Sequence, residues 1–143
     1  MHAPLVHRLR VRYHECDQQG IVFNANWFAY FDITLTELWR AAFGSYTAMI
    51  ERGADTVVVD ASAQFKAPGR FDDQLEIALA LETLGTSSMV AGLAATRDGE
   101  TLVTGRIVHV FVDPTTMAKQ PIPAWAREAL APYVTGSSGS GAR

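Results

Sequence analysis

The stretch "NANWFAYFDITLTELWRAAF", residues 24–43, decides how this chain folds. It predicts one long helix, which Asn24 or Asn26 can cap and Gly44 can end. Apolar side chains fall on nearly every side of this helix. Its polar positions form one narrow stripe at helical spacing: Asp32, Thr36 and Arg40. Because a helix that is apolar on most faces is normally buried on most faces, we expect other elements of the chain to wrap around it.

Five strands are predicted to supply this wrapping. Residues 5–13 alternate, with Tyr13 among the inward positions and arginines on the other side, as in a half-buried strand. Four later segments are β-branched or alternating and are bounded by turn residues: 56–65, 74–83, 87–97 and 101–112. The pair Asp98-Gly99 is typical of a tight hairpin. Because no helix separates these four strands, we expect an antiparallel meander curled around the helix, hence an α+β fold with a short helix near 123–133.

Composition limits the class of protein. With 143 residues, 48% apolar and 19% charged, the chain is expected to form one globular domain over 1–134, followed by a flexible Gly/Ser-rich tail over 135–143. A net charge of −3 argues against nucleic-acid binding, which relies on many Lys and Arg contacts to phosphates. No segment approaches the ~20 apolar residues of a membrane span, and none looks like a signal peptide. Cys16 is the only cysteine, so we expect no internal disulfide and a cytoplasmic protein.

The edges of the predicted sheet point to an oligomer. A sheet that covers a single helix keeps open edges, whose unpaired backbone groups invite pairing with another strand. We therefore expect the chain to form a homodimer.

A candidate reactive group lies just before the helix. In "ECDQQGIVFNANW", residues 15–27, Asp17 lies on a polar loop that Gly20 can turn with a positive φ. The first amides of a helix are unpaired donors, so they can hold an anion or an oxygen that becomes anionic during a reaction. A carboxylate beside them would place a base or nucleophile next to an oxyanion pocket, which suits acyl transfer or hydrolysis. The alternative is that Asp17 only forms the turn.

Other reactive side chains give weaker indications. Cys16 could act as a nucleophile with His14 as its base, but a small residue that fills a turn is the simpler interpretation. The four histidines show no ligand spacing, so no metal site is expected.

Three blocks of the sequence resemble a known family. The first, "DQQGIVFNANW" (Asp17–Trp27), closely resembles the active-site signature of hot-dog-fold acyl-CoA thioesterases, in the branch of 4-hydroxybenzoyl-CoA thioesterase and its YbgC-like relatives. The second, "FKAPGRFDDQL" (Phe65–Leu75), looks like a later conserved block of that branch, and "PIPAW" (Pro121–Trp125) lies where those proteins begin their terminal helix. The resemblance covers about residues 6–133 and implies the hot-dog fold, a long helix wrapped by a curved antiparallel sheet.

The resemblance also implies an activity and a set of site residues. It implies hydrolysis of an acyl-CoA thioester without a metal or cofactor. The catalytic carboxylate maps onto Asp17, acting either as a nucleophile that forms a mixed anhydride or as a general base for water. The oxyanion-binding backbone amide maps onto Asn24, and Gly20 looks like the turn residue that lets the loop approach the substrate. Sites of this family form between subunits of a dimer, usually within a tetramer.

The region that would bind the CoA phosphates departs from the family pattern. The hairpin that carries a basic cluster in the hydroxybenzoyl enzyme reads "LGTSSM" here, without charge. Five other cations are candidates for this role: Lys66, Arg70, Arg97, Arg106 and Lys119. The missing cluster also keeps open a carrier-protein thioester as substrate. A non-catalytic binder of acyl thioesters is a further alternative.

Asp32 is the residue that bears on the acyl group. A charge in the middle of this apolar helix is costly unless it is paired or hydrated. In the first interpretation, Asp32 pairs with Arg40 or is exposed at an interface. In the second, it lines the acyl pocket and accepts a hydrogen bond from a hydroxyl or amino group of an aromatic acyl ring. This second interpretation favours an aromatic acyl group such as hydroxybenzoyl. Trp27 and Phe28 are interpreted as core or dimer contacts, with substrate contact as the alternative.

Overall fold

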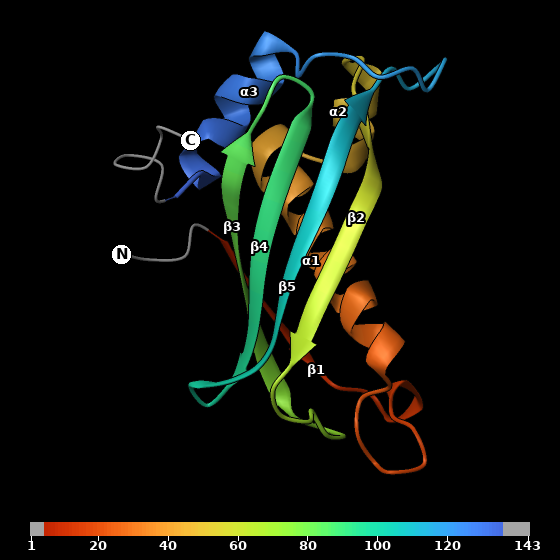
Figure 1. Ribbon diagram of the computed structural model, residues 1–143, viewed down its shortest axis with the longest axis vertical. Helices are drawn as coiled ribbons and strands as arrows, with labels where there is room; N and C mark the ends of the chain where they lie inside the picture. Colours follow the sequence, from red (N-terminus) through yellow and green to blue (C-terminus); the bar gives the residue numbers. More distant parts are fainter. Residues whose placement is uncertain (1–4, 136–143) are drawn as a thin grey trace.

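A computed structural model describes residues 5–135 of the chain and shows one long helix on the inner face of a five-stranded sheet (Figure 1). The helix, α1, spans Asn24–Phe43. The strands are β1 (Leu5–Arg10), β2 (Asp55–Phe65), β3 (Gln74–Leu84), β4 (Ser88–Arg97) and β5 (Glu100–Val112). The predicted α+β architecture is confirmed. Of the predicted tail, residues 136–143 lie outside the described part.

The order of the strands differs from the predicted meander. The order across the sheet is β1-β3-β4-β5-β2, with every neighbouring pair antiparallel. Only β3, β4 and β5 follow one another, whereas β2 pairs with β5 at the far edge, so the expectation of a four-stranded meander is wrong. The connection explains the difference. Residues 66–73 separate β2 from β3, and this loop is longer than the about two to five residues that join the strands of a hairpin.

The ends of α1 lie where they were predicted, but only one of the two is capped as predicted. Gly44 ends the helix with a φ of 92°, as expected, and its N–H donates to Arg40 O. The N-cap, however, is Phe23, whose side chain makes no capping bond, so the prediction that Asn24 or Asn26 caps the helix is wrong. Asn26 uses its side-chain amide for a tertiary bond to Glu15 O instead, at 2.8 Å.

Smaller elements complete the fold. The first strand ends at Arg10, and Tyr13, predicted to face inward, is 81% exposed in a 3-10 turn (η1, Tyr13–Glu15). A short helix that the sequence analysis did not predict, α2 (Tyr46–Glu51), follows α1. The predicted C-terminal helix is present as α3 (Ala124–Leu130) with a 3-10 turn, η2 (Ala131–Tyr133). No helix within residues 5–135 is long and apolar enough to cross a membrane.

The sheet covers one side of α1 and leaves the other open. Seven of the helix's 20 residues are buried, which is too few for burial on most faces, so that expectation is wrong for the single chain. Four of the six exposed positions lie along one stripe of the helix, namely Ala25, Ala29, Asp32 and Arg40, and the other two, Asn24 and Ala41, lie near its ends. On the covered side, Phe31 is fully buried against β5, where Gly105 leaves room for its ring. Within the single chain, α1 is therefore covered by the sheet on one side only.

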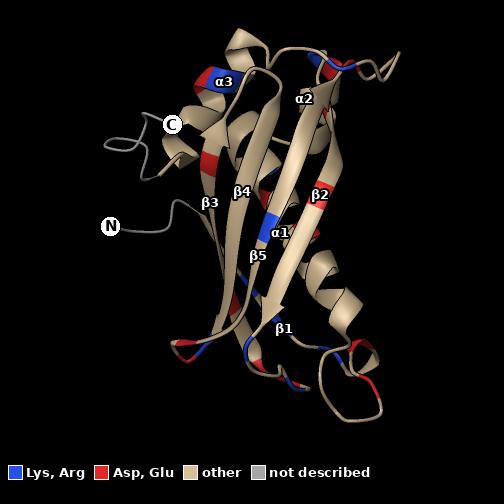
Figure 2. Ribbon diagram, viewed as in Figure 1, with Lys and Arg blue, Asp and Glu red and all other residues tan. Residues whose placement is uncertain are grey.

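The two edges of the sheet are not equivalent. Strand β1 has only six residues, and the rest of this edge of β3 is partly covered by residues 134–135: Val134 forms a bridge with Leu81, and Thr135 N–H donates to Leu81 O at 3.1 Å. The opposite edge, β2, is 11 residues long and carries exposed Val59 and Phe65. Charged residues of both signs are dispersed over the fold without a continuous stripe of one sign (Figure 2). The long open edge therefore lies at β2.

Candidate active site

The loop that carries Asp17 is a tight, internally bonded turn. Asp17 N–H donates to Ile21 O and Gly20 N–H donates to Asp17 O, both at 2.9 Å. The Asp17 side chain accepts from Gln19 N–H through Oδ1 at 2.8 Å, and Gly20 adopts the predicted positive φ of 78°. Asp17 is partly buried. The turn thus holds a carboxylate in a defined place a few residues before α1 begins.

Glu15 ties this loop to the helix, a role that the sequence analysis missed. Although only 8% exposed, its carboxylate accepts from Tyr30 OH and Arg12 N–H at 2.8 Å and pairs with the Arg12 guanidinium. Its backbone oxygen accepts from Phe23 N–H and the Asn26 side chain. Burial alone would raise the pKa of Glu15, but the bonds from Arg12 and Tyr30 outweigh it and hold that pKa below its ordinary value. A glutamate two residues before Asp17 was the available signal.

Cys16 does not have the properties of a nucleophile. Burial raises the pKa of its thiol, and the neighbouring carboxylates of Asp17, Glu15 and Asp73 raise it further. Because the thiolate is the reactive form, this environment favours an inert thiol. The interpretation of Cys16 as a residue that fills the turn agrees with this position.

The first two blocks that resemble the family, Asp17–Trp27 and Phe65–Leu75, lie against each other. Ile21 forms an isolated antiparallel bridge with Arg70, and Val22 N–H donates to Gly69 O at 2.8 Å. A Cβ at Gly69 would lie 2.9 Å from the Trp27 ring, so glycine is needed there for the close approach. Trp27 itself is 2% exposed and packs edge-on against Tyr30, as expected of a core residue. The loop after β2 therefore supports the start of α1.

A hollow of about 260 Å³ opens at the start of α1. Asn24 is the first helical residue, so its N–H has no partner inside the helix, and no other hydrogen bond to it occurs within residues 5–135. This helix-start hollow is lined by residues of the Asp17 loop, of α1, of the end of β2 and of the loop after β2. They are Ile21, Val22, Asn24, Trp27, Phe65, Lys66, Ala67 and Pro68. The free amide, the cation Lys66 and an apolar wall thus share one concave surface.

A second cavity of about 220 Å³ lies further along the same seam between α1 and β2. This mid-helix cavity is lined by Phe28, Phe31, Asp32, Leu35, Val58, Ala61, Ile107 and His109. Asp32 is exposed and lies about 12 Å along the helix axis from Asn24. The alternative pairing of Asp32 with Arg40 is not found, because the carboxylate within ion-pair distance of Arg40 is Glu37, at 3.7 Å. Asp32 therefore lines a cavity and is also exposed, so the acyl-pocket role and the exposed position at an interface both stay predictions.

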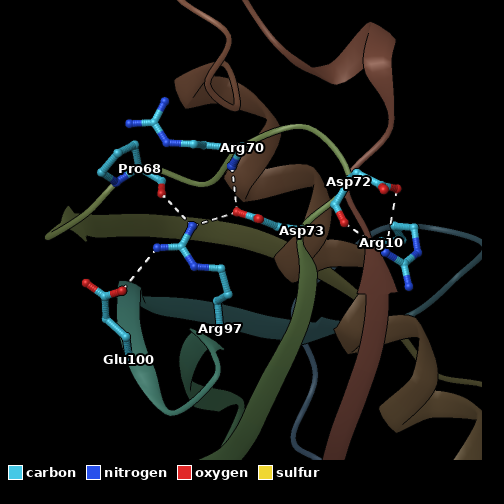
Figure 3. Close-up of polar contacts among 7 residues, drawn as sticks. All are labelled: Arg10, Pro68, Arg70, Asp72, Asp73, Arg97 and Glu100. Atoms are coloured by element: carbon cyan, nitrogen blue, oxygen red, sulfur yellow. Dashed lines mark hydrogen bonds and ion pairs between the residues drawn. The ribbon is translucent and has the colours of Figure 1, made fainter.

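The candidate cations fall into two groups. Arg97 is held by Asp73 at 2.6 Å, Glu100 at 3.0 Å and Pro68 O at 3.2 Å (Figure 3). Arg106 pairs with Glu82 at 3.2 Å. The side chain of Arg70 instead extends away from Asp73, which binds only its backbone N–H (Figure 3). Within residues 5–135, Arg70, Lys66 and Lys119 form no ion pair. Arg70 and Lys66 lie beside the helix start, whereas Lys119 forms an isolated bridge with Val112, the last residue of β5.

The structure thus brings together part of the predicted site. Asn24 and Trp27 line one hollow, and the backbone of Arg70 joins the loop that forms its rim. Asp17 belongs to the same loop but does not line that hollow, and Asp32 lies two helical turns away. Besides Glu15, a second buried residue of this region was not predicted from the sequence: His109, which is 4% exposed and lines the mid-helix cavity. Its alternation with Ile107 and Phe111 on β5 was the signal that it faces inward.

This arrangement can be compared with known proteins. The model of the thioesterase superfamily matches residues 19–110, from the Asp17 loop through most of β5. The chain belongs to this superfamily. The predicted thioester hydrolase with a hot-dog fold is thereby confirmed at the level of the family.

Individual relatives agree with this assignment. A putative esterase from Aquifex aeolicus is 37% identical over 81 residues, which span 57% of this chain but only 63% of that relative. The acyl-CoA thioester hydrolase YbgC of Escherichia coli O157:H7 is 28% identical, over 80% of this chain and 87% of the relative. Among solved structures, a Pseudomonas aeruginosa protein covers 92% of both chains at 29% identity with a TM-score of 0.82. A gentisyl-coenzyme A thioesterase covers 86% of this chain and 99% of its own, with 25% identity and a TM-score of 0.79.

Proposed function

We propose that the chain hydrolyses acyl-CoA thioesters, with Asp17 as the catalytic carboxylate and the Asn24 N–H as the oxyanion donor. The observation that carries this proposal is the joining of a carboxylate loop to a helix start whose first amide is free. The named activity of the relative YbgC, an acyl-CoA thioester hydrolase, supports CoA as the thiol. The soluble, cytoplasmic location predicted from the sequence is kept as part of this proposal.

In this mechanism the thioester carbonyl lies between Asp17 and the start of α1. As a general base, Asp17 takes a proton from water, the resulting hydroxide attacks the carbonyl carbon, and the Asn24 N–H binds the oxygen that becomes negative. The C–S bond then breaks, and the proton passes to the sulfur of the leaving CoA. As a nucleophile, Asp17 would instead attack the carbonyl itself and displace the CoA thiolate, which takes up a proton; water then cleaves the resulting mixed anhydride and restores the carboxylate. Gly20 serves both routes because it shapes the loop.

For the acyl group we propose the mid-helix cavity, with an aromatic acyl group preferred. Its volume of about 220 Å³ exceeds the roughly 150 Å³ of an apolar protein cavity that binds benzene. The lining is mostly aliphatic and aromatic, and Asp32 supplies a hydrogen-bond acceptor for a ring substituent. Trp27 stabilises the wall of the helix-start hollow, through which the acyl group would pass. The gentisyl-coenzyme A thioesterase among the structural relatives is consistent with an aromatic substrate.

We also propose that the active unit is a homodimer, formed through the β2 edge and assembled further to a tetramer. A second copy along β2 would pair its open backbone groups and close over the α1–β2 seam, where both cavities lie. A lysine at Val59, which is 57% exposed on β2, should halve the mass measured by light scattering. The control is Val6→Lys on the other edge, which should leave the mass unchanged. An unaltered mass for Val59→Lys would contradict the proposed interface.

The first experiment measures loss of thioester absorbance with benzoyl-, 4-hydroxybenzoyl-, phenylacetyl- and aliphatic acyl-CoAs. Asp17→Asn, which keeps the shape of the side chain but not its charge, should lower kcat by about 10²–10⁴-fold. Asp98→Asn, in the β4–β5 hairpin, is the matched control and should retain full activity. Equal turnover by wild type and Asp17→Asn would refute the assignment of Asp17.

Two alternatives give different results in the same assays. A thioesterase for carrier-bound acyl groups would show poor turnover of every CoA ester, and the KM for its substrate would depend less on salt because fewer phosphates are contacted. A non-catalytic binder would bind acyl-CoAs without consuming them. Hydrolysis of either thioester explains the free Asn24 amide beside a carboxylate loop, whereas a non-catalytic binder does not.

A further inference from the structure

His109 is a buried polar side chain without a partner. It lies on β5 between Ile107 and Phe111, faces α1, and is 4% exposed. Its Nδ1 is fully buried and forms no hydrogen bond within residues 5–135. Because a buried polar atom without a partner destabilises the fold, such an atom in a native protein requires an explanation.

Two concave surfaces meet at this histidine. The mid-helix cavity lies on one side, and on the other a polar hollow of about 260 Å³ is lined by Asp32, Thr36, Trp39, Tyr46, Thr56, Val58 and His109. Asp32, Val58 and His109 belong to both linings. The apolar end of the seam, near Phe28, faces the helix start, so the two polar groups lie at the end that is far from Asn24.

The electrostatic environment keeps the imidazole neutral. Burial lowers the pKa of His109, and the negative charge of Asp32 opposes this only in part. A neutral imidazole has one nitrogen that donates and one that accepts a hydrogen bond. The ring is held in place edge-on against Trp39, with the ring centroids 6.1 Å apart. An oriented, neutral histidine next to a carboxylate can bind a hydroxyl, which both donates and accepts.

We propose that His109, together with Asp32, recognises a hydrogen-bonding group at the far end of the acyl chain and so determines substrate specificity. This inference rests on the proposed placement of the acyl group in the mid-helix cavity. The ligand chemistry is an apolar, ring-sized acyl group that ends in a hydroxyl such as a phenol. When such a substrate binds, its hydroxyl bonds to Nε2, because the fully buried Nδ1 has no surface toward the cavity.

The test compares matched substrates that differ by one hydroxyl: benzoyl- and 4-hydroxybenzoyl-CoA, and cinnamoyl- and 4-hydroxycinnamoyl-CoA. In His109→Leu the preference in kcat/KM for the hydroxylated member should fall by about tenfold, and His109→Gln should restore part of it. Ile107→Val, in the same cavity, is the control and should change both members of each pair alike. The melting temperature of His109→Leu should be unchanged or higher, since the substitution removes an unpaired polar group.

A binding experiment separates this inference from the proposed hydrolysis. Calorimetry with phenol and toluene, which differ by the hydroxyl, requires no catalysis. Wild type should bind phenol more tightly than toluene, and His109→Leu should lose this preference. If wild type cleaves no acyl-CoA but prefers phenol, the proposed function fails while the role of His109 stands. A wild type without hydroxyl preference, or a preference that survives in His109→Leu, would overturn the inference.

Discussion

Gly105→Ala tests whether the contact between β5 and α1 sets the shape of the acyl cavity. A Cβ at Gly105 would lie 2.4 Å from Cε2 of Phe31, which is closer than van der Waals contact allows. Phe31 is fully buried, so its ring can move only by displacing its neighbours or by entering the mid-helix cavity that it lines. Overpacking of this kind typically costs about 1–3 kcal/mol. For a chain of this length, that corresponds to a fall in melting temperature of about 3–9 °C.

The matched control lies on the neighbouring strand. A Cβ at Gly92 would meet the exposed Glu82 carboxylate at 3.0 Å, and this flexible side chain can move away. Gly92→Ala should therefore be neutral or stabilise by up to about 1 kcal/mol through the lower entropy of the unfolded chain. Urea unfolding and calorimetry at one protein concentration give the stabilities, and KM for the best acyl-CoA reports the cavity. Equal stability and equal KM for the two variants would refute the assigned packing of Phe31.

Two further predictions concern the CoA phosphates and the anchor of the catalytic loop. The substitutions Lys66→Ala and Arg70→Ala should each raise KM for acyl-CoA by about fivefold, since a cation–phosphate contact near the surface contributes about 1 kcal/mol. Arg106→Ala should leave KM unchanged, because Glu82 already binds that guanidinium. A KM that responds equally to all three would contradict this division. Glu15→Gln should lower the stability of the fold at pH 7 and make that stability less dependent on pH in the acid range. Because the folded pKa of Glu15 is below 4.5, its contribution is present above that pH and is lost as pH falls through the folded value. Urea midpoints at pH 7 and pH 3.5 measure this loss of stability. If the variant loses as much stability as wild type between these two pH values, the prediction is contradicted.

Much of the fold follows from local sequence. The bounds of α1 are predicted to the residue, because its apolar run is uninterrupted and Gly44 follows it. The later strands are predicted to within about one residue because alternation and turn residues are local signals. Asp98-Gly99 forms the expected tight turn, with both residues at positive φ. The caps of α1 were not predictable, since Asn26 makes its bond to a residue outside the helix.

The candidate site is divided in the same way. The sequence alone determined that Asp17 lies on a glycine-containing turn ahead of a helix, because that geometry depends only on nearby residues. The resemblance then added its proposed role. Tertiary structure decided that β2 pairs with β5, that Arg97 is occupied by carboxylates, and that His109 lies unpaired beside Asp32. These facts depend on which distant side chains the strand register and the curvature of the sheet bring together, and no local pattern carries that information.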